Sequence, residues 1–246
     1  MAIYHREFAQ LSDEWFAMRR GIPTASSFDK IITAGGKEEK CKPSSQAIGY
    51  MNRLLAEWVL GEDLEENPYQ SEWMQHGKEW ESACVKNFEF QTELEAETIG
   101  FVTTDDGIIG CSPDRLVGED GLLEVKNPAP WTQISYILEG ASMPEEYKIQ
   151  TQGQLWVCER DKCFVSSFHP KLPPFLGLVG RNESLIGKIS AAVRTFVDVM
   201  LEKRLELERR FGPFVRPEPK RKKEIDDCEG FGVSEADLEG LWSNSV

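Results

Sequence analysis

The sequence lacks the marks of several protein classes. No apolar run approaches the ~20 residues that a membrane-spanning helix needs. Segment 1–10 has no basic stretch followed by an apolar run, so we expect no signal peptide and a cytoplasmic protein. The six cysteines include no Cys-x-x-Cys pair and the three histidines are scattered. We therefore expect free thiols, with neither a structural zinc site nor an iron–sulfur cluster.

Positive charge is also scarce, because the formal net charge is -14 at pH 7. Proteins that bind phosphates over their whole surface are usually basic. Contact with nucleic acid would therefore need a local basic patch within an acidic surface, unless the acidity serves only solubility. The 246 residues, 40% hydrophobic and 28% charged, predict a globular protein with one large domain, or one domain plus a tail.

Apolar spacing and turn residues predict blocks of helix and strand. A block of helices comes first, then a meander of strands, and then a helix, a strand and a long helix. This order predicts an α/β or α+β fold with a mixed central β-sheet flanked by helices. The expected helices cover 12–21, 24–32, 44–60, 71–91, 144–157 and 183–211, and the expected strands cover 98–104, 107–117, 121–126 and 162–169.

The pattern breaks beyond Pro213. Prolines surround the basic run 220–223, and an acidic stretch with few hydrophobic residues follows it. We interpret 1–212 as the domain and 213–246 as a flexible tail, which is either a disordered end or a partner-binding segment.

The sharpest chemical signal lies where two expected strands meet. Side chains alternate along a strand, so Leu123 and Val125 face one way while Glu124 and Lys126 share the other face. A hairpin would bring Asp114, at the end of the preceding strand, beside Glu124. Buried charges are costly unless they are paired or bound to a metal.

Two carboxylates on adjacent strands suit Mg2+ or Mn2+. A metal there would lower the pKa of a bound water, and Lys126 could orient that water or help to deprotonate it. The alternative is a buried Glu124–Lys126 salt bridge, or a solvated face of a hairpin.

Glu81 provides the first support. It lies on or beside the apolar stripe of the helix 71–91, which is formed by Trp73, Gly77, Trp80, Cys84 and Phe88. An inward carboxylate needs a cation, whereas a carboxylate at the border of the stripe could pair with Lys78.

Glutamines provide the second support. Tyr147, Gln150 and Gln154 share one helical face, and Gln152 points elsewhere. Such a polar row could position a water or a phosphate, or it could belong to an ordinary amphipathic helix.

A helix start that follows a pair of basic residues provides the third support. The free N–H groups near Thr24 and Ser26 can bind an anion, and Arg19 adds a bidentate phosphate donor. The alternative is a common helix cap with a nearby surface arginine.

Together these stretches resemble the YqaJ-like viral recombinase family of phage-lambda-exonuclease-like nucleases, from about Phe8 to Phe211. The resemblance depends on the order and spacing of six motifs: Trp15…Arg19-x-Gly21-x-x-Thr24-Ala-Ser26, Gly77-Lys-x-x-Glu81, Ser112-Pro-Asp114, Leu123-Glu-Val-Lys126, Gln150-x-Gln152-x-Gln154-x-Trp156 and Phe168-His-Pro170.

The resemblance implies a restriction-endonuclease-like core and a phage or prophage protein of a bacterial host cell. It also implies two Mg2+ ions, which Mn2+ could replace, bound by Asp114, Glu124, Glu81 and the backbone carbonyl of Val125. Lys126 would orient the attacking water, and Gln150 would assist it.

The family's pocket for a 5′-phosphate matches Arg19, Thr24 and Ser26, with Arg20 as an alternative to Arg19. The resemblance further implies a ring-shaped homotrimer around duplex DNA and a single-strand annealing protein as partner. Candidates for a basic channel in the ring are Lys37, Lys40 and Lys42.

The sequence thus predicts a metal-dependent 5′→3′ exonuclease that degrades double-stranded DNA from its ends to mononucleotides. One alternative is a RecB-like nuclease or an endonuclease of the same fold. Another is a non-catalytic adaptor that binds DNA ends in recombination.

Overall fold

The computed structural model describes residues 1–32, 44–64, 72–140 and 147–214, with the backbone alone over 72–79. The loop lysines Lys37, Lys40 and Lys42 and nearly all of the predicted tail lie outside these ranges, so their roles stay predictions. No helix within the described ranges is long and apolar enough to cross a membrane.

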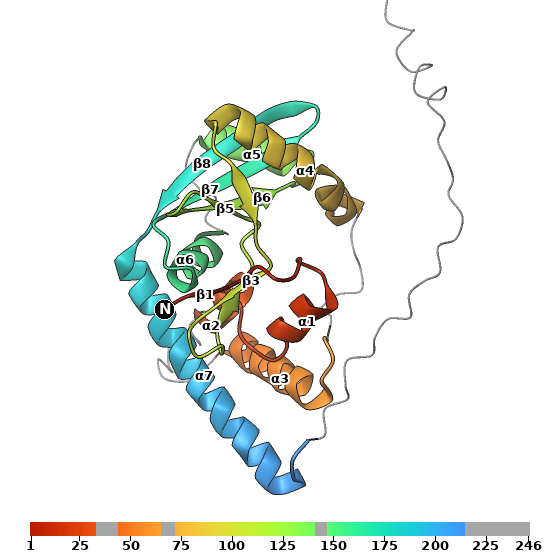
Figure 1. Ribbon diagram of the computed structural model, residues 1–246, viewed down its shortest axis with the longest axis vertical. Helices are drawn as coiled ribbons and strands as arrows, with labels where there is room; N and C mark the ends of the chain where they lie inside the picture. Colours follow the sequence, from red (N-terminus) through yellow and green to blue (C-terminus); the bar gives the residue numbers. More distant parts are fainter. Residues whose placement is uncertain (33–43, 65–71, 141–146, 215–246) are drawn as a thin grey trace, which may run out of the picture. The chain divides into compact units, whose positions relative to one another are not determined.

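The larger sheet has the strand order β2-β5-β6-β7-β8 (Figure 1). Its β6–β7 pair is parallel and its other pairs are antiparallel, which confirms the predicted mixed sheet. The strands are β2 (Ala96–Thr98), β5 (Arg115–Val117), β6 (Gly121–Lys126), β7 (Lys162–His169) and β8 (Leu172–Gly180).

A smaller antiparallel sheet has the order β1-β3-β4, with β1 (Ile3–His5), β3 (Phe101–Thr103) and β4 (Gly110–Cys111). The single strand predicted over 107–117 is therefore wrong, because β4 and β5 belong to different sheets. Pro113 lies in the break between them and has no N–H to donate to a ladder. Asp114 consequently precedes β5 instead of ending a strand.

The helices agree with the prediction over most of the chain. The side chains of Ser12 and Ser44 cap α1 and α3, accepting from Trp15 N at 3.2 Å and from Ala47 N at 3.1 Å. The helical elements are α1 (Asp13–Arg19), the 3-10 turn η1 (Ala25–Ser27), α2 (Phe28–Ile32), α3 (Ser45–Leu60), α4 (Glu72–Thr92), α5 (Pro130–Glu139), α6 (Lys148–Val157) and α7 (Glu183–Phe211).

The predicted strand 98–104 contains β3 but only the last residue of β2, and three further elements, β1, α5 and β8, were absent from the sequence prediction. Pro130 starts α5 at a helical position where its missing N–H costs nothing. Pro173 and Pro174 lie in β8, and prolines argue against a strand except at the edge of a sheet. Since β8 is an edge strand, its prolines are tolerated there.

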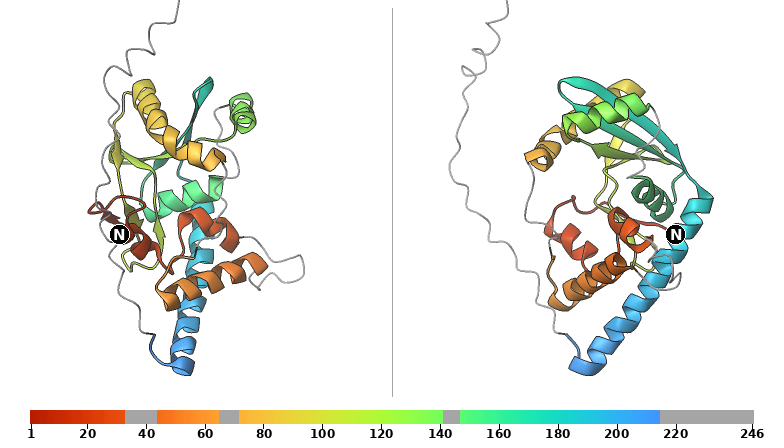
Figure 2. Two further views of the ribbon diagram at one scale, coloured as in Figure 1. Left: turned by 90° about the vertical axis from the view of Figure 1, so that its right-hand side faces the viewer. Right: turned by 180° about the vertical axis from the view of Figure 1, so that it is seen from behind.

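Helices cover both faces of β6. Leu123 and Val125 pack with Cys84 on α4, whereas Leu122 packs with Leu155 on α6 and with residues of α7. Figure 2 shows α4 and α6 on opposite sides of this sheet. The alternation predicted for β6 is confirmed, so Glu124 faces α6.

The described cysteines are all free and buried. The prediction of free thiols is confirmed for Cys84, Cys111, Cys158 and Cys163, whereas Cys41 and Cys228 lie outside the described residues.

Candidate active site

Asp114 and Glu124 meet across the β5–β6 hairpin. The register pairs Arg115 with Leu123, which places Asp114 next to the Glu124–Val125 segment. The backbone N–H of Val125 donates to Oδ2 of Asp114 at 2.6 Å. The hairpin thus aligns the first carboxylate with the strand that carries the second.

The carboxylate of Glu124 is buried, with the residue only 3% exposed. Its Oε1 accepts from Lys126 Nζ at 2.5 Å and from Gln150 Nε2 at 2.6 Å. Its Oε2 accepts from Gln154 Nε2 at 2.7 Å. Three donors from β6 and α6 therefore offset the cost of burying this charge.

The two glutamines that reach Glu124 belong to the helical face predicted from their spacing. Gln152 points away from them, donating to the carbonyl of Gly180 at 2.9 Å and accepting from Asn182 N at 2.8 Å. Sequence reasoning assigned a catalytic role only to Gln150. Gln154 makes an equivalent contact with the other carboxylate oxygen, and only its place on the same face pointed to it.

The charges in this cluster act on one another. Burial and the neighbouring charge of Glu124 raise the pKa of Asp114 above its ordinary value. Burial alone would lower the pKa of Lys126, but the neighbouring groups, Glu124 foremost and then Asp114 and Tyr147, together outweigh that effect and the pKa is raised. The Lys126 ammonium also lies 4.6 Å from the centre of the Tyr147 ring. The raised pKa of Asp114 indicates a site that favours additional positive charge.

Glu81 lies beside this cluster but is engaged elsewhere. Its Oε1 pairs with Arg115 Nη1 at 3.0 Å, and its side chain is 39% exposed. Its negative charge still contributes to the raised pKa of Asp114, so the two carboxylates are neighbours. Within the described part of the chain, no three His, Cys, Asp or Glu side chains are gathered as metal ligands. The structure thus brings Asp114 and Glu124 together and leaves Glu81 with Arg115.

The donor atoms of the cluster fit a hard divalent cation. Asp114 and Glu124 offer carboxylate oxygens, which Mg2+ and Mn2+ prefer. The side-chain oxygen of Gln154 is buried and makes no hydrogen bond with any residue that the structure describes. These two carboxylates would hold the ion, and the carbonyl of Val125 and a released Glu81 would be further oxygen ligands.

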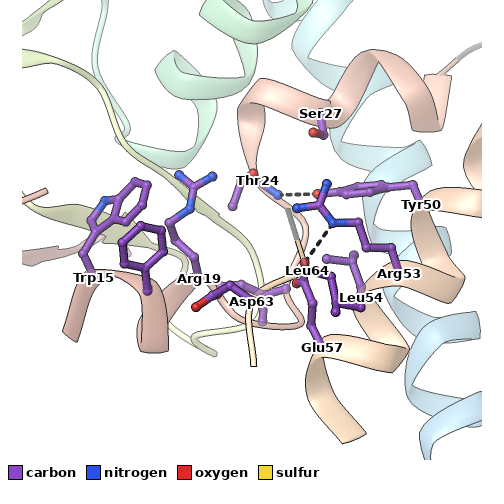
Figure 3. Close-up of a pocket in the computed structure, with 12 residues that line it drawn as sticks. Trp15, Arg19, Thr24, Ser27, Tyr50, Arg53, Leu54, Glu57, Asp63 and Leu64 are labelled. Carbon is purple, nitrogen blue, oxygen red and sulfur yellow. Dashed lines mark hydrogen bonds and ion pairs between the residues drawn. The ribbon is translucent and has the colours of Figure 1, made fainter. Parts of the chain in front are cut away.

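A second polar site is a pocket of about 140 Å³ formed by α1, η1, α3 and the residues that follow α3 (Figure 3). Polar and charged side chains from all three elements line it, namely Arg19, Thr24, Ser27, Tyr50, Arg53 and Glu57.

Arg19 is a cation of this pocket whose charge is only partly compensated. Its Nη1 donates to Ser112 Oγ at 3.3 Å, and its guanidinium lies 4.1 Å from the centre of the Trp15 ring. Among the described residues, Arg19 has no carboxylate within ion-pair distance. Burial lowers the pKa of the Arg19 guanidinium, as expected for a charge with incomplete compensation. Arg19 is therefore positioned to bind an incoming anion.

Thr24 also lies in the pocket, where its backbone N–H donates to the Tyr50 hydroxyl at 3.2 Å. The predicted Ser26 is exposed and contacts Thr24 through their hydroxyls at 3.2 Å, whereas its neighbour Ser27 lines the pocket. Arg20 does not line the pocket, but it pairs at 3.0 Å with Asp63, which does. Of the two adjacent arginines, the structure places only Arg19 in the pocket.

Ser112 joins the pocket to the carboxylate cluster. Its Oγ contacts Arg19 and accepts from Trp15 Nε1 at 2.9 Å. It lies two residues before Asp114, in the break between β4 and β5. Sequence reasoning used Ser112 only as part of a motif, because the side chains that it contacts come from about a hundred residues earlier.

A model of the YqaJ-like viral recombinase domain matches residues 14–161. The chain belongs to this family. It is similar to the crystal structure of an alkaline exonuclease, LHK-Exo, from Laribacter hongkongensis, at 27% identity and a TM-score of 0.70. The structure of LHK-Exo in complex with dAMP gives 28% identity and a TM-score of 0.71. Both matches cover 81% of this chain and 97% of the other.

A phage-related exonuclease from Haemophilus somnus 129PT shares the fold at 17% identity and a TM-score of 0.55, over 74% of this chain and 96% of its own. No curated protein sequence matches the chain. The family and these structures confirm the predicted restriction-endonuclease-like fold and support a nuclease role in recombination.

Proposed function

We propose that this protein is a Mg2+-dependent exonuclease that degrades double-stranded DNA 5′→3′ from its ends to 5′-mononucleotides. The observation that carries the proposal is the short path from Arg19 through Ser112 to Asp114. A terminal 5′-phosphate bound at Arg19 would direct the next phosphodiester towards Asp114 and Glu124. Such a site removes one nucleotide per cut and fixes the direction of digestion.

The residues of the carboxylate cluster supply what in-line hydrolysis needs. A divalent cation, when bound there, lowers the pKa of a water and offsets the charge of the phosphoryl group. Lys126, held as an ammonium against Glu124, orients the attacking water. Gln150 holds the same oxygen of Glu124 and so keeps the carboxylate in place.

Two further parts of the proposal concern partners. Strand removal by this enzyme would expose single-stranded DNA for an annealing protein. A homotrimeric ring would let a basic channel coexist with the net charge of -14. The mass of the purified protein in solution, by light scattering, tests the trimer.

The direct test uses linear duplex DNA with 5′-phosphates, labelled separately at each end, beside covalently closed circular DNA. With Mg2+ we expect release of 5′-mononucleotides from the 5′ ends of the linear DNA and intact circles. With EDTA we expect no release.

Other outcomes identify the alternatives. Cleavage of the closed circle would indicate an endonuclease. Loss of the 3′ label before the 5′ label would indicate digestion in the 3′→5′ direction, opposite to the proposal. Binding to DNA ends without release of nucleotides in Mg2+ or Mn2+ would indicate an adaptor.

A further inference from the structure

The anion pocket contains a second guanidinium that the predicted 5′-phosphate site did not include. Arg53 reaches into the pocket from α3, and Arg19 reaches into it from α1. In Figure 3 the two guanidinium groups lie on either side of Thr24. Burial is the main cause that lowers the pKa of Arg19; Tyr50, Asp63 and Glu57 act against it, and the positive charge of Arg53 adds a smaller lowering effect. The two cations are thus near enough to repel each other, which favours an anion between them.

Arg53 is fixed in the pocket by a buried acid. Its Nε donates to Glu57 Oε1 at 2.8 Å, and Glu57 is only 5% exposed. The other oxygen of Glu57 accepts from the backbone N–H of Gly21 at 3.2 Å. Glu57 therefore positions Arg53 and also fastens the turn that leads from α1 to Thr24.

The turn at Gly21 leaves no room for this arrangement to shift. Its φ is +74°, in the left-handed region, and a Cβ there would lie 3.0 Å from Trp58 Cβ and 3.2 Å from Leu54 O on α3. The backbone that carries Thr24 is thus packed directly on the helix that carries Arg53.

An ordinary ion pair on a helix surface does not account for the burial of Glu57 or for its contact with Gly21. Arg53 and Glu57 have the i, i+4 spacing at which exposed ion pairs form, and such pairs contribute little to stability. An exposed pair has no buried carboxylate and no contact with a neighbouring turn. The other acid of the pocket, Asp63, is paired with Arg20. Within the described ranges, Arg19 therefore has no carboxylate at ion-pair distance, although the charges of Asp63 and Glu57 act on it, and Arg53 shares Glu57 with Gly21.

We propose that Arg53, held by Glu57, is the second phosphate-binding cation of this pocket and makes it select a terminal phosphate monoester over an internal diester. A terminal phosphate carries about -1.5 to -2 charges at neutral pH, whereas a diester carries about -1. Two guanidiniums match the first charge better than the second. This inference rests on the proposed function, because it assigns the substrate group of the same pocket.

The test compares kcat/KM on linear duplexes that differ only in a 5′-phosphate or a 5′-hydroxyl. Wild type should prefer the phosphorylated duplex. Arg53→Gln should reduce that preference at least ~10-fold, equivalent to about 1.4 kcal/mol, because it removes a charge-assisted hydrogen-bond donor to the phosphate. Arg53→Lys should retain part of it, because it keeps the charge and loses the fork.

Arg210→Gln is the matched control, because it removes one exposed arginine of α7 that pairs with Glu206. It should retain the wild-type preference. Binding of the two duplexes in EDTA, followed by fluorescence anisotropy, gives a second readout that needs no hydrolysis. Arg53→Gln should weaken binding of the phosphorylated duplex more than binding of the hydroxyl duplex.

The outcomes separate the inference from the proposed function. If the wild-type enzyme releases nucleotides from 5′-phosphate and 5′-hydroxyl ends equally well, the assignment of this pocket to a 5′-phosphate is wrong. A clear wild-type preference that Arg53→Gln and Arg53→Lys both retain in full would overturn only the role of Arg53. Thermal denaturation of each variant shows whether it is folded, and Arg53→Lys keeps the test decisive if Arg53→Gln does not fold.

Discussion

The ammonium of Lys126 lies 2.5 Å from Oε1 of Glu124, and the two side chains leave the same face of β6. Gln150 Nε2 reaches the same oxygen from α6 at 2.6 Å. One carboxylate oxygen thus fixes both the group proposed to orient the water and the glutamine proposed to assist it.

Lys126→Ala should reduce kcat by about a hundredfold or more, the range expected for loss of a positioned hydrogen-bond donor at the reacting centre. The fold should survive, because Gln150 and Gln154 still satisfy Glu124. Lys162→Ala is the control, since Lys162 is a partly exposed lysine of β7 that pairs with Asp120. Steady-state kinetics with Mg2+ measure the effect. Wild-type rates for Lys126→Ala would contradict the proposed mechanism.

Gln154→Leu should impair catalysis although sequence reasoning gave this residue no catalytic role. It removes the donor to Glu124 Oε2 and a buried oxygen that has no hydrogen-bond partner in the described part of the chain, at similar side-chain size. Loss of a hydrogen bond to a charged group costs about 1.5–3 kcal/mol, so we expect a decrease in kcat/KM of roughly tenfold or more. The Mg2+ concentration for half-maximal rate should also rise.

The control for Gln154→Leu is Gln91→Leu, which changes an exposed glutamine near the end of α4. Kinetics over a range of Mg2+ concentrations should leave this variant unchanged. Equal behaviour of the two variants would show that Gln154 does not position Glu124.

The parts of the site that lie within one element were accessible from the sequence. The two-residue period of a strand predicted that Glu124 and Lys126 share a face, and helical spacing separated Gln150 and Gln154 from Gln152. Local periodicity fixes the direction of a side chain within its own element, so these predictions needed no tertiary information.

The contacts between distant elements were not accessible in this way. Nothing local predicts that Ser112 meets Arg19, or that Glu57 meets Gly21, because chain topology brings them together. The edge strand β8 was missed for a related reason. Its prolines are compatible with a strand only at the edge of a sheet, and the sequence does not show which strand is at the edge.

Arg19→Ala and Arg20→Ala should differ although the residues are adjacent. Among the residues that the structure describes, Arg19 lies in the pocket with no carboxylate at ion-pair distance, whereas the charge of Arg20 is paired with Asp63 at 3.0 Å. Arg19→Ala should therefore lower kcat/KM on 5′-phosphorylated duplex by about a hundredfold, a loss of roughly 2–3 kcal/mol. Arg20→Ala should cause a clearly smaller decrease. A larger loss for Arg20→Ala would reverse the assignment made from the structure.

Gly153→Ala should destabilise the fold at the base of the site. A Cβ on Gly153 would lie 2.6 Å from Cδ2 of Phe28, a buried ring of α2, and 3.3 Å from Cβ of Ala25. Overpacking of this kind costs about 1–3 kcal/mol. Because Gly153 lies between the glutamines of α6, the strain should also lower activity.

Gly187→Ala is the matched helical control, because a Cβ there meets nothing within 4 Å. It should leave the protein equally stable, or more stable by about 0.5–1 kcal/mol, since alanine loses less backbone entropy than glycine in a helix. Urea denaturation of both variants measures the free energies of unfolding. If Gly153→Ala is as stable as Gly187→Ala, the close packing of α6 on α2 is contradicted.

Asp114→Asn should abolish nuclease activity and yet stabilise the metal-free protein at neutral pH. The pKa of Asp114 is raised in the folded state by burial and by the charge of Glu124. A raised carboxyl pKa means that the stability contributed by the protonated group is present below its unfolded pKa, about 4, and is lost as pH rises through the folded pKa. Asparagine stays neutral and can still accept from the N–H of Val125, so it avoids this loss.

The direction of this change in stability can be checked with a second aspartate, whose pKa is shifted the opposite way. Lys162 lowers the pKa of the exposed Asp120, so Asp120→Asn should slightly destabilise the protein at neutral pH. With EDTA present, the Tm of Asp114→Asn should exceed that of wild type at pH 7, and the difference should vanish as the pH approaches about 4. A lower Tm for Asp114→Asn than for wild type at pH 7 would show that the ionised carboxylate is not a cost to the fold. The convergence of Asp114 and Glu124 would then not be the reason that the site favours a cation.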